Sequence, residues 1–456
     1  MDNFINKEYI NELLENAKNA TEEQIGIVLN KAKNLKKLSH EEVAILLQIR
    51  TDEQTKNLYE AAGHIKNRLY GNRVVLFAPL YVSNYCTNNC TYCGYKRDNK
   101  FPRTKLNQQQ ISDEIKVLEK LGHKRLALEV GEDKINSNID YVLDTIDWIY
   151  QAGDIRRINV NIAATTVENY KRLKEKEIGT YILFQETYDK DAFEKYHPKS
   201  LKGNYERQLY AHHNAMEAGI DDVGGGVLFG LADYKVEVLS LLLHNEELEN
   251  KYNVGFHTIS VPRLQKAEGM DLTDYQHLIT DDDFKKIVTI LRLAVPYTGL
   301  ILSTRESKEI REQLIECGIT QISAGSQTGV GGYKESEKDL EVNQFELSDE
   351  RSPIEIIKWL LKMNYLPSYC TACYRMGRTG DHFMDIVKAG KIGSMCHPNA
   401  LMTLSEYVRD FGDNELLELS NIFIENEITK IDNEVIRKTL RKNLIRISKG
   451  ESDLYV

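Results

Sequence analysis

Eight short apolar runs, separated by helical stretches, constrain the fold of this 456-residue chain more than any other feature. The segments between the runs are amphipathic, as at residues 108–122 and 203–219. Buried parallel strands read as such apolar runs, and alternating strands and helices indicate a parallel sheet. Eight repeats predict an α/β fold of the closed (β/α)8 barrel type, with an open doubly wound sheet as the alternative. The runs are residues 73–80, 124–130, 157–163, 180–186, 222–230, 257–264, 299–305 and 321–326.

The segment before the barrel is predicted to be helical. Thr21, Ser39 and Thr51 each precede a Gln or Glu by three residues, which is the pattern of a capping box at a helix start. Apolar residues recur at three- and four-residue spacing between these positions. Residues 1–70 therefore read as a helical N-terminal extension.

After the last strand, residues 327–350 are polar, contain glycines and read as a linker. Ser352 and Pro353 then predict the start of a helix, with a capping residue followed by proline at the first position. We expect three domains: the extension at 1–70, the barrel at 71–340 and a C-terminal iron–sulfur cluster domain at 341–456.

Composition excludes several classes of partner. The formal charge is −10, and no dense Lys/Arg stripe interrupts this acidic balance, so nucleic acid is not expected as the main partner. No stretch approaches 18 apolar residues, so no membrane span is expected. The N-terminus is polar and acidic where a secretory signal would be basic and then apolar, which predicts a cytoplasmic protein.

Six of the seven cysteines fall into two groups of three. An odd count in a long chain does not suggest a disulfide framework. The first group, Cys86, Cys90 and Cys93, follows the first strand and should lie at the C-terminal rim, where barrels build active sites. A structural zinc requires four ligands, whereas an iron–sulfur cubane held by three thiolates keeps one iron open. A structural zinc site stays as the alternative.

The second group is Cys370, Cys373 and Cys396, spaced C-x2-C-x22-C. His397 is adjacent and is a possible fourth ligand of a structural zinc. Glycines and arginines in the same segment offer backbone amides and cations that would stabilise the negative charge of a cluster.

The spacing C-x3-C-x2-C, with Tyr92 before the last cysteine, resembles the radical S-adenosylmethionine (SAM) superfamily. The resemblance implies a 4Fe–4S cluster whose open iron chelates SAM. One electron from the cluster would cleave SAM to a 5′-deoxyadenosyl radical, which abstracts a hydrogen atom from the substrate. Tyr92 is then a predicted cofactor contact.

Further SAM contacts follow from the same resemblance. Gly131 and Glu132 match the superfamily's GGE-like segment, although Val130 stands where the first glycine would be. Glu186, which ends the fourth strand, matches a polar contact to SAM. Arg207 matches the arginine that pairs with the SAM carboxylate, a role that suits its planar fork.

From about residue 60 onward, the chain resembles the HydG family of FeFe-hydrogenase maturases, which are radical SAM tyrosine lyases. The stretches that carry the resemblance are YVSNYCTNNCTYCGY, HTISVPRL, CTACYRMGRTG and CHPNA. The related tyrosine lyase of the thiamine pathway, ThiH, shares the barrel and the first motif but lacks the C-terminal three-cysteine domain. The second cysteine group therefore discriminates between the two.

The HydG resemblance implies cleavage of the Cα–Cβ bond of L-tyrosine to p-cresol and dehydroglycine. Dehydroglycine would break down to carbon monoxide and cyanide. Both would be captured on an extra iron at a second 4Fe–4S-type cluster, with L-cysteine as the bridge, for assembly of the hydrogenase H-cluster. Expected partners are L-tyrosine, SAM, L-cysteine, a one-electron donor and downstream hydrogenase maturation proteins.

In this family a histidine in the HTISVPRL motif ligates the extra iron, which points to His257. His257 opens the sixth strand, so it should lie at the N-terminal floor of the barrel, roughly 23 Å from the rim by strand length.

Tyrosine carries a carboxylate, so a cation is expected at the rim. Arg305, which ends the seventh strand, is the candidate; Ser323 or Ser326 could add a hydrogen bond, and Tyr81 could contact the substrate. Cys317, the seventh cysteine, lies on a predicted helix and reads as a small buried hydrophobe.

Two other functions compete. The first is a tyrosine lyase (2-iminoacetate synthase) for thiamine thiazole synthesis, in which the second cluster is only structural. The second is an iron–sulfur scaffold or carrier without radical chemistry, which would not need Glu132, Glu186 and Arg207 on a barrel.

Overall fold

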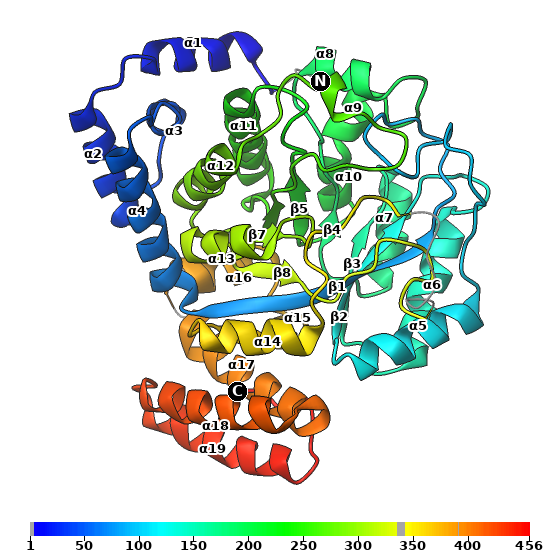
Figure 1. The fold of residues 1–456 in the computed structure, drawn as a ribbon, viewed down its shortest axis with the longest axis vertical. Helices are drawn as coiled ribbons and strands as arrows, with labels where there is room; N and C mark the ends of the chain where they lie inside the picture. Colours follow the sequence, from blue (N-terminus) through cyan, green and yellow to red (C-terminus); the bar gives the residue numbers. More distant parts are fainter. Residues whose placement is uncertain (1–3, 335–342, 391) are drawn as a thin grey trace.

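A closed barrel of eight parallel strands forms the centre of the molecule (Figure 1). The computed structural model describes residues 4–334, 343–390 and 392–456. The ring closes because β1 pairs in parallel with both β2 and β8, so the barrel prediction is confirmed and the open sheet was wrong. The strands are β1 (Arg73–Ser83), β2 (Arg125–Val130), β3 (Arg157–Asn161), β4 (Tyr181–Ile182), β5 (Val223–Gly226), β6 (Thr258–Ser260), β7 (Gly299–Leu302) and β8 (Gln321–Ser323).

Helices between consecutive strands cover the outside of the barrel. Their apolar faces pack on the strands and form one continuous core. They are α5 (Gln108–Lys120), α6 (Ile139–Ala152), α7 (Val167–Glu175), α8 (Lys190–Tyr196), α9 (Tyr205–Leu209), α10 (Ala211–Glu217), α11 (Tyr234–Tyr252), the short η1 (Leu272–Asp274), α12 (Asp281–Ala294) and α13 (Lys308–Cys317). Cys317 ends α13 and is buried, as expected.

The N-terminal extension is helical and lies along one side of the barrel (Figure 1). Thr21, Ser39 and Thr51 each form the predicted capping box. The helices are α1 (Lys7–Ala17), α2 (Glu22–Lys33), α3 (His40–Leu46) and α4 (Asp52–Tyr70).

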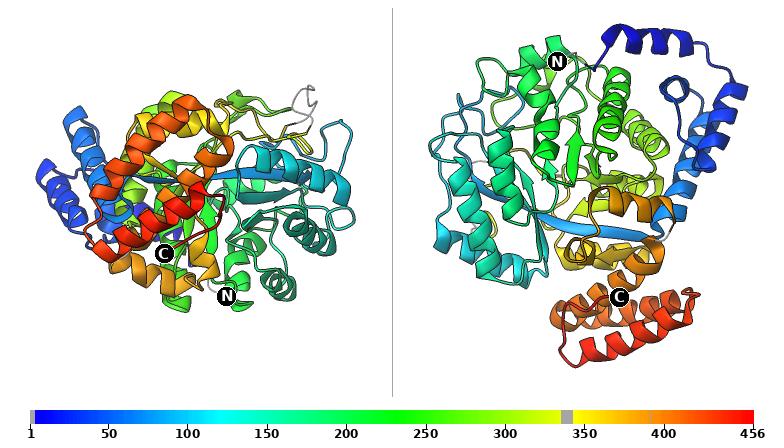
Figure 2. Two further views of the ribbon diagram at one scale, coloured as in Figure 1. Left: turned by 90° about the horizontal axis from the view of Figure 1, so that it is seen from below. Right: turned by 180° about the vertical axis from the view of Figure 1, so that it is seen from behind.

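The chain after the barrel adds a strand that the sequence did not predict. β9 (Leu366–Ser368) pairs in parallel with the N-terminal end of β1, joining Val75 to Ser368. The capping box at Ser352 begins the helix before it, as predicted. The helices of this region are α14 (Pro353–Lys362), α15 (Ala372–Arg375), α16 (Gly380–Lys388), α17 (Ile392–Phe411), α18 (Asn414–Thr429) and α19 (Glu434–Ser448). Figure 2 shows α18 and α19 as a layer beyond the barrel.

The predicted boundary between residues 340 and 341 lies outside the described residues. The described parts of the predicted linker pack against the barrel: Ser348 donates from its backbone to the carbonyl of Thr304 at 2.9 Å. We keep the division into three domains as a proposal, in which β9 joins the C-terminal domain to the barrel sheet.

β1 connects the two cysteine groups. The first group follows its C-terminal end, and the second follows β9, which pairs with its N-terminal end. The stretch from Val75 to Ser83 covers roughly 26 Å at about 3.3 Å per residue. The two groups therefore lie at opposite ends of one barrel.

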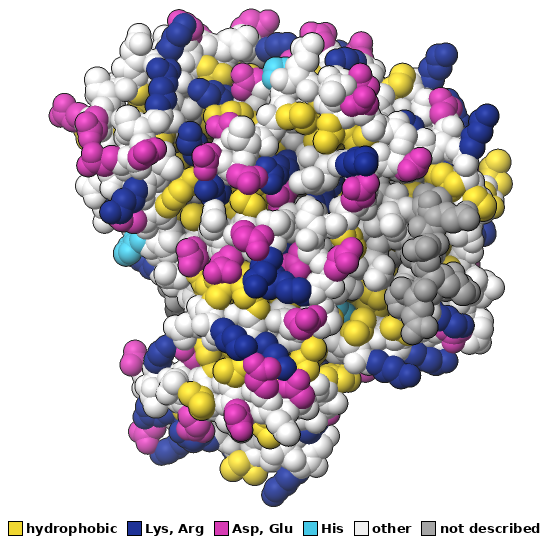
Figure 3. Space-filling view, in the orientation of Figure 1, with side chains coloured by type: hydrophobic (Ala, Val, Ile, Leu, Met, Phe, Trp, Pro, Cys, Tyr) yellow, Lys and Arg dark blue, Asp and Glu magenta, His cyan; other side chains and the backbone are white. Residues whose placement is uncertain are grey.

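The surface agrees with the charge pattern of the sequence. On the face shown in Figure 3, acidic and basic side chains are interspersed. Among the described residues, none of the helices is long and apolar enough to cross a bilayer.

Candidate active site and second cysteine site

A cavity at the C-terminal rim of the barrel is bordered by Cys86, Cys90 and Cys93. The loop that carries them is fixed to the end of β2: Thr87 donates from its backbone to the carbonyl of Glu132 at 2.8 Å. Burial raises the pKa of all three thiols, that of Cys93 to about 11. Binding of a metal cluster would therefore displace their protons.

Gly131 allows the loop and the strand end to approach closely. Its backbone N–H donates to the carbonyl of Ser83 at 3.0 Å. A β-carbon at this position would collide with the carbonyl of Tyr85, directly before the first cysteine. Any larger residue here would displace the cysteine loop.

Glu186 borders the same cavity and is paired with a lysine that the sequence analysis did not single out. Lys202 Nζ lies 2.5 Å from Glu186 Oε1, and both side chains are largely buried. The backbone of Glu186 has a φ of 68°, a left-handed conformation that non-glycine residues seldom adopt. Such strain is found mainly where the surroundings fix a functional side chain.

Glu132 borders the cavity between two donors. Asn88 Nδ2 donates to one carboxylate oxygen and Arg207 Nη2 to the other, each at 2.6 Å. Arg207 itself does not line the cavity but lies behind Glu132. The structure thus brings the two predicted SAM contacts together, with only the carboxylate facing the open space.

Tyr92 also lines the cavity, and its hydroxyl lies 2.7 Å from His197 Nε2. The two rings pack edge to face with centroids 5.5 Å apart. This pair fixes the residue before the third cysteine of the loop.

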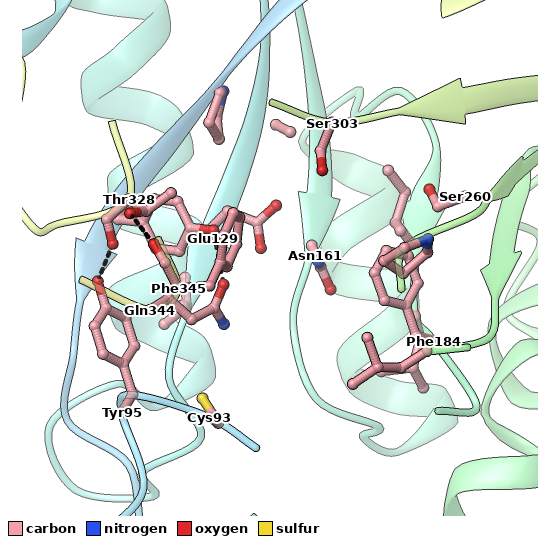
Figure 4. A pocket seen from close by; sticks show the side chains of 18 of the residues that line it. Cys93, Tyr95, Glu129, Asn161, Phe184, Ser260, Ser303, Thr328, Gln344 and Phe345 are labelled. Carbon is pink, nitrogen blue, oxygen red and sulfur yellow. Dashed lines mark hydrogen bonds between the residues drawn. The ribbon is translucent and has the colours of Figure 1, made fainter. Parts of the chain in front are cut away.

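The deeper part of the cavity carries the predicted substrate residues. Tyr81 donates to the side-chain oxygen of Gln344 at 2.7 Å. The guanidinium of Arg305 stacks 3.6 Å from the centre of the Phe345 ring. Figure 4 shows Gln344 and Phe345 on one side of an open space, facing Phe184.

The two predicted serines differ in their bonding. Ser323 Oγ accepts a hydrogen bond from the backbone of Thr304 at 3.2 Å. Ser326 Oγ lines the cavity but has no hydrogen-bond partner among the described residues. Because a buried hydroxyl without a partner is unfavourable, Ser326 is the serine better suited to bind a ligand.

Glu129 is a half-buried acid that the sequence analysis missed. It faces Asn161 across the pairing of β2 and β3. Burial raises the pKa of Glu129 to about 8, although Arg305 and a hydrogen bond with Asn161 oppose this shift. The cavity therefore holds a carboxyl group that titrates near neutral pH.

A second cavity lies at the opposite end of the barrel. Its lining includes all three cysteines of the second group, together with His257. Three guanidinium groups, from Arg73, Arg125 and Arg378, border it as well. A hydrogen bond from Cys373 lowers the pKa of Cys396, and Arg73 and Arg378 add to the effect. The site favours bound anions.

His257 is held within this second site. Its Nδ1 lies 3.1 Å from Asp222 Oδ1, and its ring packs 4.9 Å from that of Phe383. Burial opposes ionisation of Asp222, but His257 and the backbone of Gly380 hold its pKa below the usual value.

His397 points away from the second cavity. Its Nε2 lies 3.1 Å from Glu427 Oε2 on α18, and it is absent from the lining among the described residues. The adjacent histidine of the sequence motif is therefore placed as an ion-pair partner between two helices. This geometry removes the fourth ligand of the alternative zinc site.

Known proteins match the whole of this arrangement. A crystal structure of HydG, a maturase of the FeFe-hydrogenase, is 51% identical, covers 100% of both chains and superposes with a TM-score of 0.97. HydG from Carboxydothermus hydrogenoformans is 38% identical over 96% of this chain and 97% of its own, with a TM-score of 0.85. The chain belongs to the HydG family.

More general matches agree with this family. Residues 80–241 match the Radical SAM superfamily, and residues 260–366 match the Biotin and Thiamin Synthesis associated domain. The 2-iminoacetate synthase of Salmonella typhimurium is 29% identical over 71% of this chain and 85% of its own length. Both domain matches end before Cys370, so they do not include the second cysteine group.

Each of the two thiol sets borders a cavity. Within the part of the chain that the structure describes, no three His, Cys, Asp or Glu side chains converge on one metal ion. Ligands of a structural zinc would lie about 2 Å from a shared centre. We call the site of Cys86, Cys90 and Cys93 the upper site and that of Cys370, Cys373 and Cys396 the lower site. The radical SAM family implies a 4Fe–4S cluster with SAM at the upper site.

Several residues of these sites carried little signal in the sequence. Glu129 could have been found, because the two-residue period of β2 places Ala127 and Glu129 on the same, lumen-facing side. Lys202 and Asp222 lie in connecting segments, and no motif marks them. The individual roles of the predicted site residues stay predictions.

Proposed function

We propose that this chain is a radical SAM lyase that cleaves the Cα–Cβ bond of L-tyrosine and collects the resulting carbon monoxide and cyanide for H-cluster assembly. The observation that carries the proposal is the pair of three-cysteine sites at opposite ends of one barrel, in a chain 51% identical to HydG over its full length. A tyrosine lyase that did not collect carbon monoxide and cyanide would need only the upper site.

At the upper site, Cys86, Cys90 and Cys93 would hold the 4Fe–4S cluster. When bound, the cluster and SAM supply a 5′-deoxyadenosyl radical that abstracts hydrogen. Glu132 faces the cavity as an acceptor for the SAM amino group, and Lys202 and Glu186 add one charge of each sign beside the thiols.

Tyrosine would bind deeper in the same cavity. Arg305 is the cation for its carboxylate, Ser326 offers an unpartnered hydroxyl, and Tyr81 and Phe345 supply aromatic walls.

At the lower site, Cys370, Cys373 and Cys396 would hold the second 4Fe–4S-type cluster. The extra iron is cargo, because it leaves with the product, and His257 would bind it with L-cysteine as the bridge. Arg73, Arg125 and Arg378 would attract the cysteine carboxylate and cyanide. A one-electron donor and downstream maturation proteins complete the proposed partners, in the cytoplasm.

The test is an anaerobic assay with reconstituted clusters, SAM, a reductant and L-tyrosine. We expect p-cresol, carbon monoxide and cyanide. Absence of p-cresol would rule out the lyase. p-Cresol without carbon monoxide would favour the second candidate, a 2-iminoacetate synthase, which the match to the Salmonella enzyme supports.

A further inference from the structure

A buried carboxylate contacts His257 in the lower site. Asp222 is 2% exposed, and its Oδ1 lies 3.1 Å from His257 Nδ1. The same oxygen accepts a hydrogen bond from the backbone N–H of Gly380 at 2.9 Å. Asp222 belongs to neither cysteine motif and does not line the lower cavity among the described residues.

The barrel topology explains why these residues meet. Asp222 directly precedes β5 and His257 directly precedes β6, and the two strands pair with Gly224 opposite Thr258. Both side chains therefore emerge at the same edge of the barrel floor. This placement depends on the strand register and not on a flexible loop.

His257 and the backbone N–H of Gly380 both contact Oδ1 of the Asp222 carboxylate. The second oxygen, Oδ2, is buried and has no hydrogen-bond partner among the described residues, and the 3.1 Å contact between His257 Nδ1 and Oδ1 lacks the angle of a full hydrogen bond. A buried carboxylate is unfavourable unless it is paired and hydrogen-bonded.

We propose that Asp222 is the positioning residue of His257, which it orients through its 3.1 Å contact with Nδ1, so that Nε2 is left as the metal-binding nitrogen. Histidine ligands commonly donate their other ring N–H to a carboxylate, which fixes the tautomer and the ring direction. The inference rests on the proposed function, since it takes His257 as the ligand of the extra iron.

Two neighbours fix the pair from the side of α16. Gly380 begins this helix and holds the Asp222 carboxylate through its N–H, while Phe383, one turn later, packs its ring against His257. Asp221, the adjacent carboxylate, is exposed and accepts a hydrogen bond from Thr379 Oγ1 at 3.4 Å. Asp221 therefore provides a matched control for the loss of one acid in the same segment.

The experiment measures binding of iron(II) to the full chain after both clusters are reconstituted, by iron quantification and Mössbauer spectroscopy with 57Fe. Asp222→Ala should weaken binding of the extra iron by about 10- to 100-fold. Asp222→Asn should lie between this variant and the wild type, because its amide oxygen still contacts Nδ1. Asp221→Ala should bind iron as the wild type does.

p-Cresol formation at the opposite end of the barrel should be unchanged in all three variants, which shows that they are folded. Wild-type iron affinity in Asp222→Ala overturns the inference, and so does an equal loss in Asp221→Ala. His257→Ala distinguishes the role of Asp222 from the proposed role of His257 as the iron ligand. If it loses the iron and Asp222→Ala does not, only the inference fails; if it retains the iron, the proposed role of His257 fails and the inference with it.

Discussion

The two cysteine sites share three thiols but differ in the charges around them. Charged side chains of both signs border the upper cavity: three glutamates, one lysine and one arginine. The lower cavity has three arginines and, among the described residues that line it, no carboxylate. The upper surroundings suit zwitterions such as SAM and tyrosine, whereas the lower ones suit anions.

The connection to the barrel differs as well. The upper cysteines lie on a loop directly after β1, at the end where barrels place their catalytic groups. The lower cysteines follow β9, a strand added to the outside of the ring. The upper site is therefore built on a loop of the barrel itself, while the lower site lies on segments that follow the barrel and pack at its N-terminal end.

Substitution of one cysteine in each of the two sites should have the largest effect on product formation. Cys93→Ala should reduce p-cresol formation to background, because the upper cluster loses one of its three thiolates. Cys373→Ala should retain p-cresol but lose carbon monoxide. Both products are measured in one anaerobic assay by chromatography and by haem-protein capture of carbon monoxide.

Cys317→Ala provides the control, since this cysteine is buried at the end of α13 outside both sites. It should form both products as the wild type does. Loss of p-cresol in Cys373→Ala would contradict the proposal that the upper site cleaves tyrosine and the lower site collects the products.

Removal of the positive charge of Arg305, the proposed partner of the tyrosine carboxylate at the upper site, should have the next largest effect on the reaction. Arg305→Met removes a charged hydrogen bond worth about 1.5–3 kcal/mol, which corresponds to a rise in the KM for tyrosine of roughly 10- to 100-fold. SAM binding should be unchanged. Arg378→Met, at the lower site, should leave this KM at its wild-type value. An equal rise in both variants would show that Arg305 acts through general charge and not through contact.

The half-buried Glu129 at the upper site should make stability depend on pH. The pKa of Glu129 is about 8 in the folded chain, above its ordinary value of 4.5. Between these values the unfolded chain loses the proton and the folded chain keeps it, so the free energy of unfolding should fall with rising pH, by at most roughly 1.4 kcal/mol per unit. Glu129→Gln should flatten this slope in urea unfolding from pH 5 to 8.

The exposed Glu206 provides the control, and Glu206→Gln should keep the wild-type slope. A slope that survives in Glu129→Gln would assign the titration to another group.

The barrel could be predicted because each strand is buried on both faces and reads as an apolar run. After β1, the strands are shorter than the predicted runs: the run at 180–186 forms only the two-residue β4 (Tyr181–Ile182), and its last residue, Glu186, turns away in a left-handed conformation. The run continues past the ladder because its later residues line the cavity. Amino-acid composition alone does not distinguish residues buried within the barrel strands from residues that line the cavity.

Other features could not be predicted because they depend on contacts between distant segments. β9 contains Pro367, which argues against a strand, yet the structure tolerates it at the edge of the sheet. Asp222 lies near His257 because the paired strands β5 and β6 bring their starts together. Lys202 lies near Glu186 because the chain returns to the end of β4 after helix α8. The cysteine motifs locate the sites, but the charges that distinguish them come from the fold.

The smallest effect should come from the histidine beside the lower site. His397 pairs with Glu427 at 3.1 Å, and Glu427 also pairs with Lys430, so His397→Ala leaves the carboxylate with a partner. We expect a loss of about 0.5–1 kcal/mol in the free energy of unfolding, with cluster iron and carbon monoxide unchanged. Cys396→Ala, one residue away, should lose both. If His397→Ala lost cluster iron as well, this histidine would be a ligand, and the lower site would no longer match the upper one in its three-thiol set.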